Sequence, residues 1–136
     1  MKSLPFIFAA FSLFSISALA EDAKPAVSNV KDVSVEEAAK LIQDNPKTLV
    51  LDVRTPEEFS KGHIPGAKNV DFHDDDFAKK VGALDPATPV VVHCAAGGRS
   101  KQSLDALKDK KIVYHMKDGF KAWEKAGKPV EGGEKK

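Results

Sequence analysis

Short apolar runs rich in β-branched residues alternate with amphipathic stretches through most of the 136-residue chain. Two of these runs, TLVLDV at 48–53 and VVVHC at 90–94, are almost continuously apolar. Such runs are typical of parallel strands covered on both faces, because neither side of the strand meets water. Three further runs are expected to form strands, at 29–33, 67–72 and 112–116.

The stretches between these runs carry the signals of helices. Ser34 precedes an apolar pattern of helical period and is followed by Glu37, which predicts a capping box. Thr55, Pro56 and Glu58 form a second such start, with proline at the first helical position. Further helices are expected at 74–84, 100–110 and 118–127, the last with Phe120 and Trp123 in the core.

Strands that alternate with helices predict an α/β fold. We expect a single domain over residues 30–130, with a mostly parallel five-stranded sheet and helices on both faces. In sheets of this kind, ligands bind beyond the carboxyl ends of the strands. Cys94 stands at such an end, at the close of the most apolar run, so the candidate chemistry is expected there.

Residues 1–20 are predicted to be a signal peptide, because Lys2 is followed by an apolar stretch that closes on the small-x-small motif ALA at 18–20. Cleavage after this motif leaves a short polar lead at 21–29, and residues 131–136 are expected to form a solvated tail. The alternative is an uncleaved membrane anchor, for which the apolar stretch is only marginally long enough. We therefore expect an exported protein in the periplasm, with no stable membrane association after cleavage.

Charge and side-chain chemistry exclude several partners. Without Lys2, twenty Lys and Arg residues balance twenty Asp and Glu residues, and the absence of a basic stripe argues against nucleic acid. The acidic run Asp74–Asp76 lies at an expected helix start, where carboxylates are ordinary partners of the helix dipole, and no metal-ligand spacing accompanies it. His73 and His115 stand alone in the sequence. We expect no metal and no cofactor.

Cys94 is the only cysteine, so the chain has no internal disulfide. An unpaired thiol outside the cytoplasm is a liability unless it is buried or reactive. Between Cys94 and Arg99 stand Ala95, Ala96, Gly97 and Gly98. A loop of such small residues can curl so that its backbone N–H groups point at one spot and favour an anion. We expect a Cys94 thiolate near neutral pH, with Arg99 as a cation at the rim for an oxyanion substrate.

Three sequence signatures carry a family resemblance. The stretch CAAGGRS at 94–100 resembles the active-site loop of rhodanese domains, which has the form Cys-x-x-Gly-x-Arg. The stretch LDVRTPEEFSKGHIPGAKNV at 51–70 is similar to the family's Asp-x-Arg and Gly-His-Ile-Pro-Gly-Ala signature, and DGFKAWEKAGKPV at 118–130 is similar to its closing helix. Three signatures in the expected order make the resemblance specific.

The resemblance implies a thiosulfate sulfurtransferase. Cys94 would attack the outer sulfur of thiosulfate or a similar donor, become a persulfide held by the amides of 95–98, and pass the sulfur to cyanide or a thiol. Donor binding would depend on Arg99 and these amides, so we expect modest affinity for thiosulfate. The physiological donor and acceptor stay open, an unidentified protein acceptor included.

Other residues near the signatures are expected to support the loop. Asp52 and Arg54 end a predicted strand and are expected to form an ion pair close to it, and Ser100 stands at the start of the helix that follows. His93 is expected to pack beneath the loop rather than act as a base. His63 is expected to be a turn residue bonded to the backbone.

Two alternatives compete with this interpretation. Cysteine phosphatases and arsenate reductases carry a His-Cys-x5-Arg signature, but here four residues separate Cys94 from Arg99, and Ser100 stands where their arginine would be. The shorter loop favours one sulfur atom over a tetrahedral oxyanion. The other alternative is a non-catalytic rhodanese-like module that carries sulfur or docks a partner; the intact cysteine argues against docking alone and leaves a slow carrier open.

Overall fold

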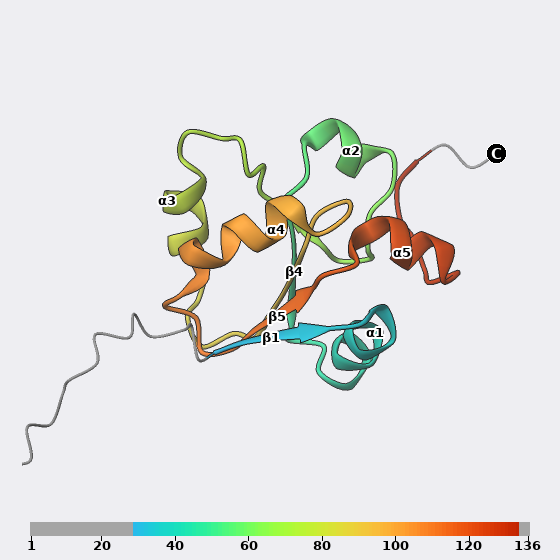
Figure 1. Ribbon diagram of the computed structural model, residues 1–136, viewed down its shortest axis with the longest axis horizontal. Coiled ribbons are helices and arrows are strands. Elements are labelled where there is room, and N and C mark those ends of the chain that lie inside the picture. The colour runs from blue at the N-terminus through green and yellow to red at the C-terminus, as the bar shows by residue number, and fades with distance from the viewer. Residues whose placement is uncertain (1–28, 134–136) are drawn as a thin grey trace, which may run out of the picture.

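Parallel pairing joins five strands into one sheet of order β1-β5-β4-β2-β3 in the computed structural model, which describes residues 29–133 (Figure 1). The strands are β1 (Val30–Val33), β2 (Leu49–Asp52), β3 (Lys68–Asn69), β4 (Val90–His93) and β5 (Val113–Met116). Every residue of the central strand β4 is buried, as its apolar sequence predicts. The expected five-stranded sheet is confirmed, and all of its described pairings are parallel.

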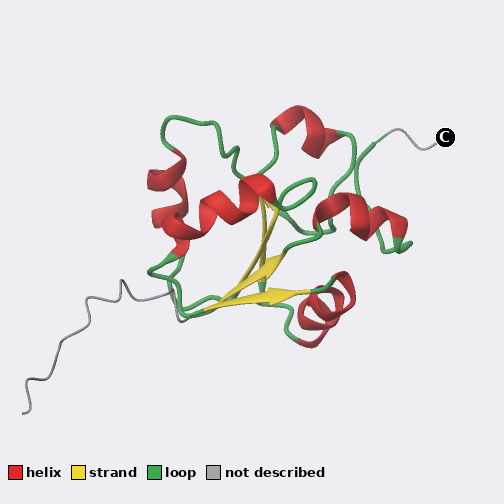
Figure 2. Cartoon of the chain, in the orientation of Figure 1, coloured by secondary structure: helices red, strands yellow, loops and turns green. Residues whose placement is uncertain are grey.

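Helices cover both faces of this sheet, as expected (Figures 1 and 2). The helical elements are α1 (Val35–Asp44), α2 (Pro56–Ser60), α3 (Phe77–Gly82), α4 (Gly98–Ser103), the 3₁₀ helix η1 (Leu104–Leu107) and α5 (Gly119–Lys125). Side chains of α1 and α5 pack on one face, and those of α3 and η1 pack on the other.

The period-two alternation of strand side chains divides the core into two clusters. The cluster under α3 and η1 contains Leu51, Val53, Val70, Phe77, Val81, Val90, Val92, Cys94, Leu107 and Val113. The cluster under α1 and α5 contains Val33, Val35, Ala38, Val50, Ile64, Val91, Met116, Phe120 and Trp123. The Cys94 side chain therefore lies on the α3–η1 side of the sheet, and Phe120 and Trp123 are core residues as predicted.

Both predicted capping boxes are present. The Ser34 hydroxyl accepts from the backbone N–H of Glu37 at 3.1 Å, and the Glu37 carboxylate accepts from the backbone N–H of Ser34 at 2.7 Å. The second box, between Thr55 and Glu58, closes in the same way at 3.2 and 2.9 Å. These local signals fix where α1 and α2 begin.

The helix expected at 74–84 is shorter than predicted, because α3 covers only Phe77–Gly82. The preceding residues form turns instead, in which the Asp71 carboxylate accepts from the backbone N–H of His73 at 2.9 Å. Short acidic side chains compete with the helical ladder in this way. Lys80 pairs with Asp74 and Asp76 at 2.8 and 3.1 Å, which accounts for two of the three carboxylates of the acidic run.

Two other elements differ from expectation. The helix expected at 100–110 begins earlier, at Gly98, and gives way to a 3₁₀ helix after Ser103, whose hydroxyl donates to the Ser100 carbonyl at 2.6 Å. A serine that bonds back to the preceding turn weakens a regular helix. The strand expected at 67–72 keeps only Lys68–Asn69, and the Asn69 side-chain amide donates to the backbone carbonyls of Asp52 and Arg54, at the end of β2 and just after it.

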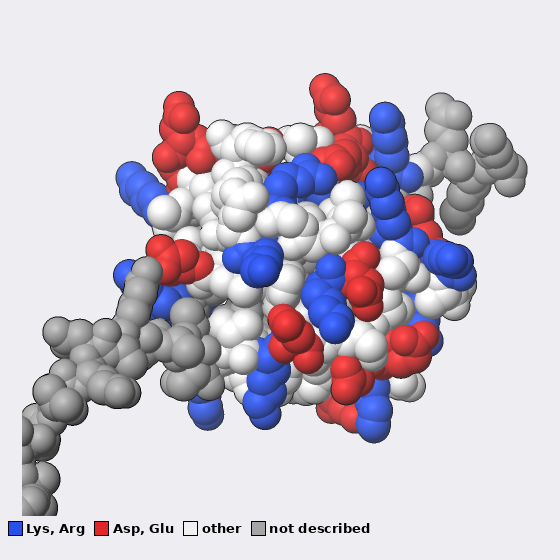
Figure 3. Space-filling model, viewed as in Figure 1, with Lys and Arg blue, Asp and Glu red and all other residues white. Residues whose placement is uncertain are grey.

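The predicted signal peptide at 1–20 and positions 21–28 of the polar lead lie outside the described residues, as does the tail beyond 133. In the described part of the chain, no helix has the length and apolar character needed to cross a membrane. On the face shown in Figure 3, acidic and basic side chains are interspersed.

Candidate active site

Cys94 follows β4 directly and lies at the floor of the loop that joins this strand to α4. The backbone N–H of Gly97 donates to the Cys94 Sγ at 3.0 Å, and the Ser100 hydroxyl lies 3.5 Å from the same sulfur. The residue is only 1% exposed. The sulfur is therefore nearly buried, with hydrogen-bond donors aimed at it from the loop and from the first turn of α4.

The start of α5 holds the loop in this shape. The backbone N–H of Phe120 donates to the Cys94 carbonyl at 2.8 Å, and the backbone N–H of Lys121 donates to the Ala95 carbonyl at 3.1 Å. The loop thus curls between the starts of α4 and α5 (Figure 1). Because the Ala95 carbonyl faces α5, the Ala96 N–H that follows it points the opposite way, and this N–H is one of the backbone donors that act on the sulfur.

Two glycines permit this close approach of loop and helix. Gly97 has φ = +101°, and a Cβ there would collide with the Lys117 carbonyl oxygen. Gly119 has φ = +74°, and its Cβ would lie 2.6 Å from the Ala95 carbonyl carbon and 2.7 Å from the Ala96 nitrogen. Gly119 was not foreseen, although a glycine at the start of the closing helix was a usable signal.

Opposing effects act on the pKa of Cys94. Burial raises the pKa of this thiol, because an apolar surrounding disfavours the thiolate. Hydrogen bonds from the Ser100 hydroxyl and from the backbone N–H groups of Ser100, Ala96 and Gly97 lower the pKa by more, so the net pKa is below its ordinary value. The site therefore favours the thiolate, which is the nucleophilic form.

Arg99 lies at the rim of the loop, but its positive charge is already paired with a carboxylate. Its two terminal nitrogens donate to the Glu58 carboxylate at 2.7 and 2.9 Å. Hydrogen bonds from Arg99 overcome the effect of partial burial and, with those from Thr55, lower the pKa of Glu58 to about 2. The expected free cation at the rim is therefore paired instead. Glu58 was not foreseen as its partner, because a capping box already accounted for that residue.

The expected ion pair between Asp52 and Arg54 is present on the other face of the sheet from the sulfur. Arg54 Nη2 lies 2.7 Å from Asp52 Oδ2 and donates to the Gly62 carbonyl at 2.8 Å. The guanidinium carbon lies 4.1 Å from the centre of the Phe120 ring. Both charged side chains are buried, so the pair ties β2 to the turn after α2 and to the start of α5.

The histidines of the region differ in what they contact. His93 is fully buried, its Nδ1 lies 3.1 Å from the Cys94 carbonyl, and burial lowers its pKa, which keeps the ring neutral. His63 is bonded through Nδ1 to the Phe59 carbonyl at 2.9 Å, as a turn residue would be. Neither ring contacts the sulfur in the hydrogen bonds of the described residues.

His115 stands alone in the sequence but has two polar partners in the fold. Its Nδ1 lies 3.0 Å from Asp32 Oδ1, and its Nε2 lies 2.9 Å from the Ser100 hydroxyl that approaches Cys94. The one signal in the sequence was a polar residue inside an apolar strand. The contacts themselves join residues far apart in the chain, so the local pattern could not reveal them.

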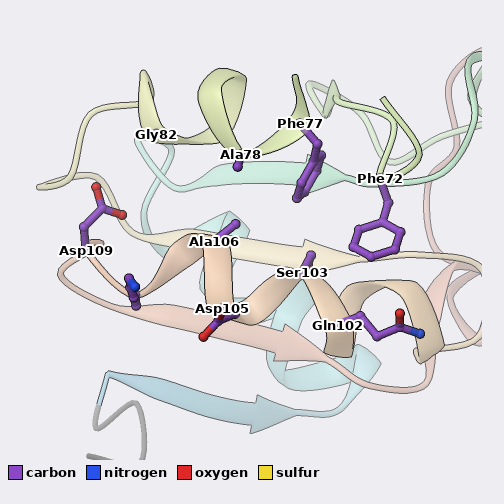
Figure 4. Close-up of a pocket in the computed structure, with 10 residues that line it drawn as sticks. Phe72, Phe77, Ala78, Gly82, Gln102, Ser103, Asp105, Ala106 and Asp109 are labelled. Atoms are coloured by element: carbon purple, nitrogen blue, oxygen red, sulfur yellow. The ribbon is translucent and has the colours of Figure 1, made fainter. Parts of the chain in front are cut away.

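The hollow between α3 and the α4–η1 segment lies away from this site (Figure 4). It measures about 590 Å³ and is lined by Phe72 and Phe77 on one side and by Gln102 and Ser103 on the other, but not by Cys94 or Arg99. Within the described residues, no three His, Cys, Asp or Glu side chains gather into a group that could hold a metal ion.

Comparison with known proteins places these features in a family. The profile of the rhodanese-like domain matches residues 34–126. The chain is 30% identical over 102 residues to a thiosulfate sulfurtransferase of Shewanella oneidensis, covering 74% of this chain and 98% of that protein. It is 38% identical over 93 residues to thiosulfate sulfurtransferase 16 of Arabidopsis thaliana, covering 60% of this chain and 78% of that protein.

Solved structures agree with the sequence matches. The fold superposes on the crystal structure of a rhodanese-related protein from Thermoplasma volcanium with a TM-score of 0.65 and 26% identity, covering 74% of this chain and 97% of the other.

Proposed function

Because this chain belongs to the rhodanese-like domain family, we propose that it is a sulfurtransferase that moves a sulfane sulfur from thiosulfate or a similar donor to cyanide or a thiol through a Cys94 persulfide. The observation that carries the proposal is the Gly97 N–H and the Ser100 hydroxyl converging on the only sulfur of the loop. The names of the relatives, thiosulfate sulfurtransferases at about 30% identity, support it.

The reaction divides into two displacements at sulfur. In the first, the Cys94 thiolate attacks the outer sulfur of thiosulfate, the sulfur–sulfur bond of the donor breaks, and sulfite leaves with the bonding electron pair. In the second, cyanide or a thiolate attacks the outer sulfur of the persulfide, and the Cys94 thiolate leaves. No external oxidant is needed, and a covalent intermediate of this kind gives ping-pong kinetics.

The paired state of Arg99 bears on donor binding. A guanidinium that shares its charge with the Glu58 carboxylate attracts a dianion less than a free one does. Backbone N–H groups of the loop then hold the anionic sulfur, and the salt bridge fixes Arg99 at the rim. Modest affinity for thiosulfate follows from this arrangement.

The first test is turnover of thiosulfate and cyanide to thiocyanate, with Cys94→Ser as the comparison. We expect the serine variant to lose turnover and the wild-type protein to gain the mass of one sulfur atom on Cys94 after thiosulfate alone. Arg99→Ala should raise the KM for thiosulfate several-fold, whereas Lys101→Ala, an exposed charge on the same helix, should leave it unchanged. Wild-type turnover no faster than that of the serine variant, with no added sulfur, would refute the proposal.

A second candidate is a sulfur carrier that turns over slowly. The 1% exposure of Cys94 favours it, because donor and acceptor must both reach a nearly buried sulfur. A persulfide that forms on Cys94 but transfers to cyanide only slowly would distinguish the carrier from the enzyme.

We also propose export to the periplasm, which rests on the sequence of residues 1–20 alone. Fractionation of cells that produce the full chain, with mass analysis of the N-terminus, tests this: a chain that begins at Glu21 in the periplasmic fraction supports export. A full-length chain in the cytoplasm contradicts it.

A further inference from the structure

Resting on the proposed function, we propose that His115 is a positioning residue that accepts the Cys94 proton through the Ser100 hydroxyl while Asp32 holds the imidazole in place. Three consecutive contacts carry the proposal: Cys94 Sγ to Ser100 Oγ at 3.5 Å, Ser100 Oγ to His115 Nε2 at 2.9 Å, and His115 Nδ1 to Asp32 Oδ1 at 3.0 Å. They lead from the nearly buried sulfur to a carboxylate that is 63% exposed.

Counting hydrogens shows that this chain of contacts has two consistent states. His115 Nδ1 faces a carboxylate, so it carries a hydrogen and donates it to Asp32. If Nε2 is bare, it accepts the single hydroxyl hydrogen of Ser100, which leaves Ser100 Oγ able only to accept from a Cys94 thiol. If Nε2 is protonated, it donates to Ser100 Oγ, and the hydroxyl hydrogen is shared between the Gly97 carbonyl at 3.1 Å and the Cys94 sulfur at 3.5 Å, of which a thiolate is the charged acceptor. The charge of the ring therefore decides what Ser100 offers to the sulfur.

Passage between the two states conserves atoms and charge. The Cys94 S–H bond breaks as a new O–H bond forms on Ser100, and the original Ser100 O–H bond breaks as an N–H bond forms on His115 Nε2. The electron pair of the S–H bond stays on the sulfur. A neutral thiol and a neutral imidazole thus become a thiolate and an imidazolium, and the Asp32 carboxylate lies against the imidazolium.

The surroundings of the ring leave Asp32 and Ser100 as its polar contacts in the described hydrogen bonds and ion pairs. On either side of β5, the register places Asp32 of β1 and Val92 of β4 opposite His115, and the latter is apolar. Helix α1 packs on the opposite face of the sheet, but its exposed Glu37, Lys40 and Asp44 line a hollow together with Asp32, and there Lys40 pairs with Asp44 at 2.7 Å. The side chain of His115 is 5% exposed, so water weakens its contact with Ser100 little, whereas the Asp32 carboxylate on its other side is 63% exposed.

Charged groups near the other end of the chain of contacts are also engaged. Arg99, which precedes Ser100 on α4, is held by Glu58 at 2.7 Å. The residues that follow β5, Lys117 and Asp118, make no ion pair with the ring among the described contacts. Among the described contacts, His115 is therefore the titratable side chain that reaches Cys94 through Ser100.

The test measures the rate of Cys94 alkylation by iodoacetamide as a function of pH. Each rate is divided by the plateau rate that the same variant reaches at high pH, which removes differences in how easily the reagent reaches the sulfur. His115→Leu removes the imidazole charge and both hydrogen bonds of the ring. The midpoint of the alkylation profile should therefore rise by about one pH unit, which corresponds to an about tenfold lower relative alkylation rate at pH 6. His115→Gln keeps a donor to Ser100 without the charge and should fall between. His73→Leu, an exposed histidine, is the matched control and should superpose on the wild type.

Asp32→Asn is the second variant, and the sign of its effect is diagnostic. Direct repulsion between Asp32 and the thiolate would make this variant ionise at lower pH. The proposal requires the opposite, because loss of the carboxylate weakens the imidazolium that stabilises the thiolate. Unchanged or lowered midpoints in His115→Leu and Asp32→Asn overturn the proposal. If His115→Leu does not fold, the alkylation midpoint of Asp32→Asn alone tests the proposal, because Asp32 is exposed. Alkylation needs no sulfur donor, so absence of sulfurtransferase activity would not affect this result.

Discussion

The contact between the active-site loop and the closing helix makes Gly119→Ala the most informative substitution. Gly119 has φ = +74°, and an added Cβ would lie 2.6 Å from the Ala95 carbonyl carbon. Gly66 has nearly the same φ, +76°, but an added Cβ there meets nothing within 4 Å. Gly66→Ala therefore carries the backbone strain without the collision, and the two variants separate the two costs.

The expected free energies follow from these distances. A left-handed conformation costs an L-residue roughly 1–2 kcal/mol, so both variants should lose about this much stability. In Gly119→Ala, the backbone of the loop must also move, which adds roughly 1–3 kcal/mol by analogy with overpacking in a core. The shift would turn the loop N–H groups away from Cys94 and raise the pKa of its thiol.

Urea unfolding followed by the fluorescence of Trp123, a buried residue of α5 and the only tryptophan, measures the stabilities. Alkylation profiles of Cys94 measure the effect on the thiol. We expect Gly119→Ala to unfold at lower urea than Gly66→Ala and to shift the alkylation midpoint upward, whereas Gly66→Ala should leave that midpoint unchanged. Equal stability losses and coincident alkylation profiles would refute the idea that α5 shapes the loop.

Two further predictions concern charged pairs. The Glu58 carboxylate has a pKa of about 2, lowered from 4.5, so its stabilising effect is complete above pH 4.5 and disappears as the pH falls toward 2. Urea unfolding at several pH values should therefore show that the free energy of unfolding falls less across this window in Glu58→Gln than in the wild type. Parallel pH dependences of the two proteins would contradict the lowered pKa of Glu58. Asp52→Ala leaves the buried Arg54 guanidinium unpaired and should lower the free energy of unfolding by about 3–5 kcal/mol. A loss below ~1 kcal/mol would show that Arg54 finds another partner.

Local signals in the sequence predicted the fold better than they predicted the site. Capping residues such as Ser34 act over a single turn, and the apolar runs determine which segments are buried, so the sheet and most of its helices could be foreseen. The pairs Glu58 with Arg99 and Asp32 with His115 join residues 41 and 83 positions apart. They depend on strand register and on how the helices pack, which no local pattern encodes.

The acidic segment at 74–76 shows that a local pattern can also predict more regular structure than the fold contains. Its composition fits the start of a helix, and the prediction was wrong because short polar side chains upstream form turns that compete with the helical ladder. The strand expected at 67–72 was also too long. Its regular register with β2 ends at Asn69, although the backbone N–H groups of Val70 and Phe72 still donate to carbonyls of the segment at 52–53.

The hydrogen bonds from Phe120 and Lys121 to the Cys94 and Ala95 carbonyls also imply that the active-site loop takes its final shape late in synthesis. During synthesis, the strand, the cysteine and the arginine all emerge before the final helix exists. Until that helix docks, its hydrogen bonds to the Cys94 and Ala95 carbonyls are absent, and the loop lacks this support. We therefore expect a growing or truncated chain to carry its only cysteine as a less reactive thiol, which gains its lowered pKa when folding is complete.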